Sequence, residues 1–202
     1  MEIIKSMWAT KSETENPQFK EIIEKFNLFG FWSRIWEYPF AILNSELKPS
    51  LKVLDAGCIG SPLLSFLHNF GCEVYGIDIL AHPSNDSIKI YKEDIKHTHF
   101  PDEFFDRIFC VSVLEHIRDD PMKSISELMR ILKSSGLLII TLDVNHGNWG
   151  WQFKEKDFLE KICKPMDFLP GSKPPDILES EQTVQGRKAG PGLSVFGLVI
   201  QK

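Results

Sequence analysis

The sequence predicts an α/β fold of three layers, a sandwich in which a doubly wound, mostly parallel sheet lies between helices. Between residues 51 and 144, short apolar segments typical of buried parallel strands alternate with amphipathic segments typical of helices. The joints between these segments are short, which places parallel strands in one sheet with helices on both faces. At 202 residues, the chain is expected to form a single domain, 1–202.

Five strands are expected in this middle part of the chain, each an apolar run bounded by Gly, Pro or polar residues. They span residues 52–56, 73–78, 87–91, 105–111 and 137–142. One helix is expected to begin at Ser61-Pro62, because Ser caps helix N-termini and Pro fits the first turn, and to end at Gly71. A second helix is expected to begin near Asp120-Pro121 and to end at Gly136.

The two flanking parts of the chain differ from the middle. Residues 1–47 are predicted to be helical, and their aromatic run 31–40 either packs a helix on the sheet or covers a ligand site, with Trp32 or Tyr38 as the cover. Residues 145–202 begin with an irregular stretch rich in Gly and Pro. They close with the apolar run 193–200, which is predicted to be the last strand.

Three acidic residues stand at the ends of three successive predicted strands: Asp55, Asp78 and Asp94. Ligands of doubly wound sheets bind at the carboxyl ends of the strands, and a carboxylate there can accept hydrogen bonds from both hydroxyl groups of a ribose. The turn 57–60 brings backbone close to a ligand at the start of a helix. Because this turn lacks the GxGxxG pattern that accommodates a pyrophosphate, an NAD-dependent oxidoreductase is disfavoured.

Five segments in this order resemble the class I, Rossmann-like S-adenosylmethionine-dependent methyltransferases, over roughly residues 50 to 145. They are VLDAGCIGSPLLSFL (53–67), VYGIDI (74–79), KEDI (92–95), FDRIFCVSVLEHI (105–117) and ELMRILKSSGLLIITLD (127–143). The resemblance implies a seven-stranded sheet with an antiparallel last strand, whose sixth strand is expected within 178–185. It also implies an N-terminal helical lid (1–47), a cofactor-binding core (50–144) and an acceptor-side segment with terminal strands (145–202).

The resemblance further implies roles for single residues toward S-adenosylmethionine. The methionine part would lie between Asp55 and Gly57, with its carboxylate near Arg34, while Asp78 would hold the ribose. The remaining implied contacts are Asp94 and Ile95 to the adenine, Cys110, Val111 and Ser112 at the sulfonium end, and Cys58, Ile59, Gly60 and Ile79 around the turn and the ribose. Ile59 departs from the family pattern, which usually has a glycine there, and a β-branched residue is poorly suited to a positive φ.

Candidate catalytic residues follow the fourth and fifth predicted strands. His116 is a candidate general base or a residue that shapes the pocket wall, and His146 is a second candidate. Glu115 and Asp143 are further candidates or simple loop carboxylates. Trp149 and Trp151 are predicted to form a wall of the acceptor site, a hypothesis that an increase in acceptor KM on replacement by Ala would support.

The composition and the charge indicate which partners are expected: nucleic acid, membrane and metal are each disfavoured. The formal net charge is −5, with acidic and basic residues mixed, so a nucleic-acid partner is disfavoured, and no apolar run is long enough to span a membrane. His97 and His99 lack a third ligand at a recognisable spacing, so no metal is expected. The four cysteines lack CxxC spacing and no secretory signal is visible, which favours a cytoplasmic protein.

These observations predict an S-adenosylmethionine-dependent methyltransferase that acts on an oxygen or nitrogen atom of a small-molecule acceptor. The alternative is a catalytically silent partner or regulatory protein that keeps this fold, and the departure at Ile59 motivates it.

Overall fold

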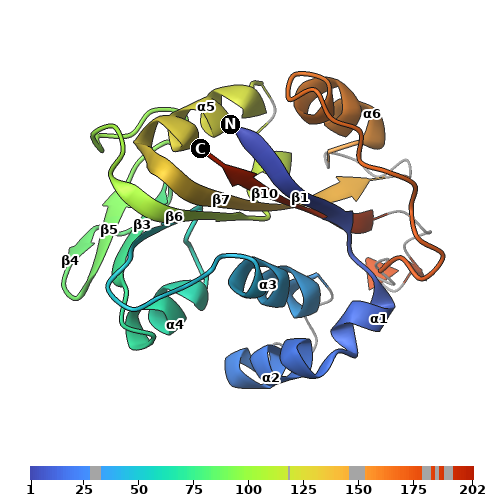
Figure 1. The fold of residues 1–202 in the computed structure, drawn as a ribbon, viewed down its shortest axis with the longest axis horizontal. Coiled ribbons are helices and arrows are strands. Elements are labelled where there is room, and N and C mark those ends of the chain that lie inside the picture. The colour runs from blue at the N-terminus through green and yellow to red at the C-terminus, as the bar shows by residue number, and fades with distance from the viewer. Residues whose placement is uncertain (28–32, 118, 146–152, 179–182, 185–186, 189–192) are drawn as a thin grey trace.

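A mixed sheet of eight strands runs through the computed structural model, in the order β1-β10-β7-β6-β2-β3-β5-β4 (Figure 1). The structure describes residues 1–27, 33–117, 119–145, 153–178, 183–184, 187–188 and 193–202. The strands of this sheet are β1 (Glu2–Trp8), β2 (Lys52–Ala56), β3 (Glu73–Asp78), β4 (Ser84–Asn85), β5 (Ile88–Lys92), β6 (Phe105–Val111), β7 (Leu132–Asn145) and β10 (Leu193–Gln201). Two further strands, β8 (Thr183–Val184) and β9 (Arg187–Lys188), pair only with each other.

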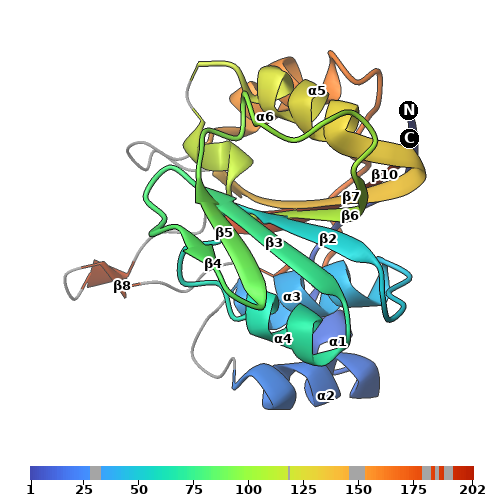
Figure 2. The same cartoon turned by 90° about the vertical axis from the view of Figure 1, so that its left-hand side faces the viewer.

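Helices cover both faces of the sheet, which gives the predicted three layers (Figure 2). One face carries α2 (Pro17–Phe26), α3 (Arg34–Leu43) and α4 (Leu63–Asn69), and α1 (Lys11–Thr14) precedes them. The other face carries α5 (Pro121–Ile131), α6 (Glu155–Phe158) and the π-helical turn η2 (Leu159–Cys163). The 3-10 turn η1 (Leu114–His116) follows β6. Two hydrophobic clusters, one for each face, form the core.

The central strands confirm the predicted doubly wound sheet. Strands β5, β3, β2, β6 and β7 are parallel to one another, whereas β4 is antiparallel to β5 and β10 is antiparallel to β7. Three predicted strands have the observed bounds, β5 is displaced by one residue, and β7 extends well beyond the predicted 137–142. The helix α5 begins, as predicted, after the cap of Asp120, whose carboxylate accepts from the backbone N–H of Lys123 at 3.1 Å.

The N-terminal part was predicted wrongly as helical throughout, because residues 2–8 form the edge strand β1. This strand pairs antiparallel with β10, with Glu2 opposite Gln201, and the two chain ends lie close together (Figure 1). The expected sixth strand within 178–185 is not part of the main sheet: β1 takes the place beside β10, and residues 183–184 pair with β9 instead. The sheet has eight strands, not seven, because the short strand β4 pairs with β5 at the other edge. The pairing partner of β1 lies at the far end of the chain, so no local pattern could reveal it.

The aromatic run before β2 packs mainly against the sheet. Trp36 and Phe40 are fully buried and stack on each other, with ring centroids 4.5 Å apart. They cover β10 at Gly197, where a Cβ atom would lie 2.6 Å from the Phe40 ring. Tyr38, on the same helix, is buried and lines a pocket at the strand ends. The helix α3 thus both packs on the sheet and borders the candidate site.

Candidate functional site

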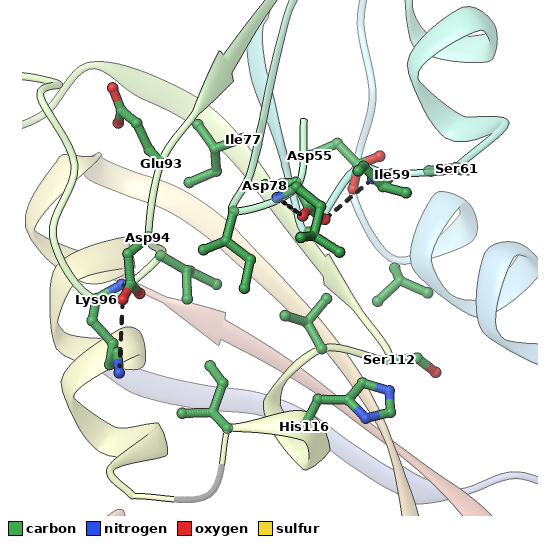
Figure 3. Close-up of a pocket in the computed structure, with 18 of the residues that line it drawn as sticks. Asp55, Ile59, Ser61, Ile77, Asp78, Glu93, Asp94, Lys96, Ser112 and His116 are labelled. Atoms are coloured by element: carbon green, nitrogen blue, oxygen red, sulfur yellow. Dashed lines mark hydrogen bonds and ion pairs between the residues drawn. The ribbon is translucent and has the colours of Figure 1, made fainter. Parts of the chain in front are cut away.

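A pocket of about 640 Å³ opens at the carboxyl ends of β2, β3, β5 and β6 (Figure 3). Parallel strands bring their carboxyl ends to one edge of a sheet, and this is where ligands bind in doubly wound folds. The pocket is lined by Arg34, Tyr38, Asp55, Gly57, Ile59, Gly60, Ser61, Ile77, Asp78, Ile79, Leu80, Glu93, Asp94, Ile95, Lys96, Val111, Ser112, Val113, His116, Ile117 and Asp119.

The turn between β2 and α4 forms one wall of the pocket. Gly57 has φ +86° and Gly60 has φ +69°, so the two glycines adopt the left-handed conformations of the turn. Ile59 keeps a φ outside that region, and its half-exposed side chain lines the pocket. The departure at Ile59 therefore causes no backbone strain, because Gly60 adopts the conformation that a β-branched residue resists.

Asp78, the last residue of β3, presents its carboxylate to the pocket beside this turn (Figure 3). One oxygen accepts from the backbone N–H of Leu80 at 2.8 Å, and the other accepts from the backbone N–H of Ile59 at 3.3 Å. These two bonds fix the orientation of the carboxylate. Each oxygen has a further lone pair, so the group can still accept from two neighbouring hydroxyl groups.

Asp55 lies deeper, at the end of β2, and is 2% exposed. Its Oδ2 atom has no hydrogen-bond partner among the described residues. Burial raises its pKa to about 6, although a hydrogen bond from Ser61 and the charge of Arg34 oppose the shift. A buried, unpaired carboxylate oxygen that faces a pocket requires a donor, and a cationic or N–H group of a ligand would supply one.

Residues after β5 form the opposite wall. Asp94 accepts from the backbone N–H of Lys96 at 2.9 Å, and the Lys96 ammonium lies 3.7 Å from the same carboxylate (Figure 3). Ile95, buried and apolar, stands between them on the chain and also lines the pocket. An apolar side chain between polar groups suits a flat heterocycle with polar edges.

At the end of β6 the pocket is bounded by Val111, Ser112 and His116. Ser112 has φ +51°, and its hydroxyl donates to Glu37 at 2.5 Å. Desolvation, and secondarily the charge of Arg34, lower the pKa of His116, so the imidazole is neutral at neutral pH. His116 remains a predicted base or wall residue, now placed at the pocket. His146, together with Trp32, Trp149 and Trp151, lies outside the described residues.

Twelve of the predicted site residues meet at this pocket, whereas Cys58 and Cys110 point into the core. The Cys58 sulfur packs against β3, 2.8 Å from where a Cβ of Gly76 would stand, and Cys110 is fully buried in the cluster on the α5 face. Burial raises the pKa of Cys58 to about 12. Neither thiol lines the pocket, although both belong to segments that do.

Glu37 is a buried polar residue at this site that the sequence analysis missed. It is completely buried in α3, forms an ion pair with Arg34, and accepts from Thr141 at 2.8 Å as well as from Ser112. A glutamate within an otherwise aromatic helix, three residues after an arginine, was the available signal. Glu93, Lys96 and Asp119 were also missed, although they stand next to predicted segments.

The described residues contain neither a membrane-spanning helix nor a metal-binding cluster. No helix of that part is long and apolar enough to cross a membrane. No group of three or more His, Cys, Asp or Glu side chains there could hold a metal ion, and His99 bonds to Glu93 on the surface.

Comparisons with known proteins give matches to methyltransferases. Residues 54–140 match the family described as "Methyltransferase domain". Among curated proteins, the chain is 33% identical over 109 residues to an uncharacterised protein of Methanocaldococcus jannaschii, covering 52% of this chain and 47% of that protein. It is 32% identical over 105 residues to the ubiquinone biosynthesis O-methyltransferase of Actinobacillus pleuropneumoniae, covering 45% and 44%. The matched regions thus span less than half the length of these curated relatives.

A solved structure extends the likeness to nearly the whole chain. The 1,6-didemethyltoxoflavin-N1-methyltransferase of Burkholderia thailandensis, solved with bound 1,6-didemethyltoxoflavin and S-adenosylhomocysteine, has a TM-score of 0.55 and 16% identity. The alignment covers 99% of this chain and 94% of that one. At this identity the comparison shows a shared fold.

Proposed function

We propose that this chain transfers a methyl group from S-adenosylmethionine to an oxygen or nitrogen atom of a small-molecule acceptor, since part of it matches the family described as "Methyltransferase domain". The observation that carries the proposal is the juxtaposition of Asp78 and Asp55 with the glycine turn in one pocket. The family match covers residues 54–140, which include both carboxylates and the turn.

The residues present fit this cosubstrate. The Asp78 carboxylate can accept from the two ribose hydroxyls, and Ile95 with Asp94 suits the adenine ring and its amino group. The unpaired, buried oxygen of Asp55 requires a donor, and the ammonium group of the methionine part would supply it. Gly57, which has no side chain, lets the ligand approach the backbone closely.

The sulfonium compound supplies an activated methyl group when bound, and the chain's own residues supply position. The walls at Asp94 and Asp55 would hold the two ends of the cosubstrate, with Asp78 at the ribose between them. Holding reactants in line contributes up to roughly 7–11 kcal/mol in the best intramolecular models. A base is needed only where the acceptor arrives protonated, and His116, which lines the pocket and whose pKa is lowered by burial, is our candidate for that base.

Isothermal titration calorimetry with S-adenosylmethionine and S-adenosylhomocysteine tests the proposal. We expect micromolar binding of both compounds by the wild type. Asp78→Ala removes two charge-assisted hydrogen bonds of about 1.5–3 kcal/mol each, so affinity should fall by more than about 100-fold. Asp86→Ala, which changes an exposed aspartate outside the pocket, is the matched control and should bind as the wild type does.

Two outcomes would contradict parts of the proposal. If neither compound binds to folded protein, the methyltransferase function is wrong and a partner or regulatory role takes its place. If both bind but Asp78→Ala binds equally well, the cosubstrate lies elsewhere in the pocket. Binding without methyl transfer to a broad set of hydroxyl and amine acceptors would favour the catalytically silent alternative.

A further inference from the structure

Glu37 is a buried carboxylate that two central strands of the sheet hold in place. Its side chain lies in the helix α3 and is 0% exposed. One carboxylate oxygen, Oε1, accepts from the hydroxyl of Ser112, directly after β6, at 2.5 Å, and from the hydroxyl of Thr141, within β7, at 2.8 Å. Since Thr141 is itself completely buried, Glu37 is a fixed anionic anchor behind the pocket.

The other oxygen of this anchor binds a cation that faces the pocket. Glu37 Oε2 forms an ion pair and a hydrogen bond with one terminal nitrogen of Arg34. The two residues stand at positions i and i+3 of α3, which places them on the same face of the helix. The Arg34 side chain is partly exposed and lines the pocket, and its guanidinium carbon lies 5.8 Å from the centroid of the Tyr38 ring. Arg34 is therefore held between the anchor and the pocket.

Only part of the hydrogen-bonding capacity of Arg34 is used. A guanidinium carries several N–H donors in a planar fork and has no acceptor. Among the residues that the structure describes, Glu37 is the one hydrogen-bond acceptor of this side chain. The remaining N–H groups can donate to a ligand in the pocket, and their planar arrangement suits a carboxylate, which can accept two of them side by side.

Asp55 lines the same pocket and has the opposite requirement. Its Oδ2 atom is buried and has no hydrogen-bond partner in the part of the chain that the structure describes. Burial raises its pKa, whereas a hydrogen bond from Ser61 and then the charge of Arg34 lower it, so the guanidinium is within electrostatic reach of Asp55. Arg34 nevertheless pairs with Glu37 and, among the described residues, with no second carboxylate. Two opposite charges thus face one pocket without being paired to each other.

Resting on the proposed function, we propose that Glu37 is a positioning residue: it holds Arg34 away from Asp55, so that both groups stay open to the amino-acid end of the cosubstrate. The carboxylate of that end requires donors and its ammonium requires an acceptor, and Arg34 and Asp55 supply one each. A pocket in which Arg34 paired with Asp55 would offer neither. Glu37 does not line the pocket, so it acts through Arg34.

The unliganded protein tests this positioning directly. Glu37→Gln keeps the shape of the anchor and an oxygen for its two hydroxyl donors, but it removes the charge that holds Arg34. The freed guanidinium should then pair with Asp55 and lower the pKa of Asp55, which means an acid dissociation constant about tenfold or more higher, measured by NMR titration of its carboxyl carbon. Arg34→Met combined with Glu37→Gln should raise this pKa instead, because no cation remains to stabilise the ionised form.

Binding experiments separate the amino-acid end from the rest of the cosubstrate. S-adenosylhomocysteine carries that end, whereas 5′-methylthioadenosine keeps the adenosine and the thioether sulfur and lacks it. The wild type should bind S-adenosylhomocysteine more tightly, and Glu37→Gln should reduce this preference about tenfold or more, the equivalent of one charge-assisted hydrogen bond. The affinity for 5′-methylthioadenosine should not change. The double variant should lose as much of the preference as Arg34→Met alone, because Glu37 acts only through Arg34.

Thr141→Val is the matched control, because it disturbs the same buried network and leaves the Arg34 pair in place. It should lower stability, but the ligand preference and the pKa of Asp55 should be those of the wild type. An unchanged pKa of Asp55 in Glu37→Gln, or equal weakening of both ligands there, would overturn the positioning role while the proposed function stands. If the folded wild type binds neither compound but Asp55 responds as expected, the proposed function fails and the placement of Arg34 by Glu37 stands.

Discussion

Replacing Gly57 by Ala should damage both stability and the pocket, for two separable reasons. Gly57 has φ +86°, and an alanine held there costs roughly 1–2 kcal/mol. A Cβ atom would also lie 2.2 Å from Cγ2 of Val113, which lines the pocket. Relieving such an overlap costs typically 1–3 kcal/mol, so the total loss should be roughly 2–5 kcal/mol.

Gly60 supplies the matched control, because it shares the conformation without the contact. Its φ is +69°, and a Cβ there would meet nothing within 4 Å. Urea unfolding should therefore show Gly60→Ala losing only roughly 1–2 kcal/mol. Adding Val113→Ala to Gly57→Ala should recover part of the additional loss, since it removes the atom that overlaps. Equal unfolding free energies for the two single alanine variants would refute this reasoning.

Two further perturbations follow from buried groups elsewhere. Gly197→Ala should lower stability by about 1–3 kcal/mol, because a Cβ would lie 2.6 Å from the Phe40 ring and 2.8 Å from Trp36. Thermal unfolding measures this loss, and an unchanged unfolding midpoint would contradict the tight packing at Gly197. The pKa of Asp55 is about 6 in the folded protein, whereas its ordinary value is 3.8. Between these two pH values the folded protein therefore keeps a proton on Asp55 that the unfolded chain has lost. Its contribution to stability should fall by about 2 kcal/mol as pH rises from 4 to 6. Urea unfolding across that range should show this loss in the wild type relative to Asp55→Asn, and a constant difference would disprove it.

The middle of the fold was predictable because its information is local. Strand–helix alternation between residues 51 and 144 indicated the parallel strands, and the caps at Ser61 and Asp120 located two helix starts. The helix α4 begins two residues later than Ser61, at Leu63 with Pro62 at the N-cap position, and the Ser61 hydroxyl accepts from the backbone N–H of Leu63 at 3.2 Å. Asp55, Asp78 and Asp94 were found in the same way, since each stands at or close to the end of a recognisable strand and such strand ends must meet at one edge.

The sequence by itself thus determined a doubly wound sheet, the glycine turn and the acidic residues at its edge. Tertiary structure alone decided that residues 2–8 would form the edge strand, because β1 is stabilised by a partner strand some 190 residues away in the sequence. It also decided which acidic residues are buried. Glu115 and Asp143 have the sequence character of loop carboxylates, yet α3, η1 and β7 bring them together with Glu37. Burial and mutual proximity are properties of packing between distant segments, and no periodicity along the chain encodes them.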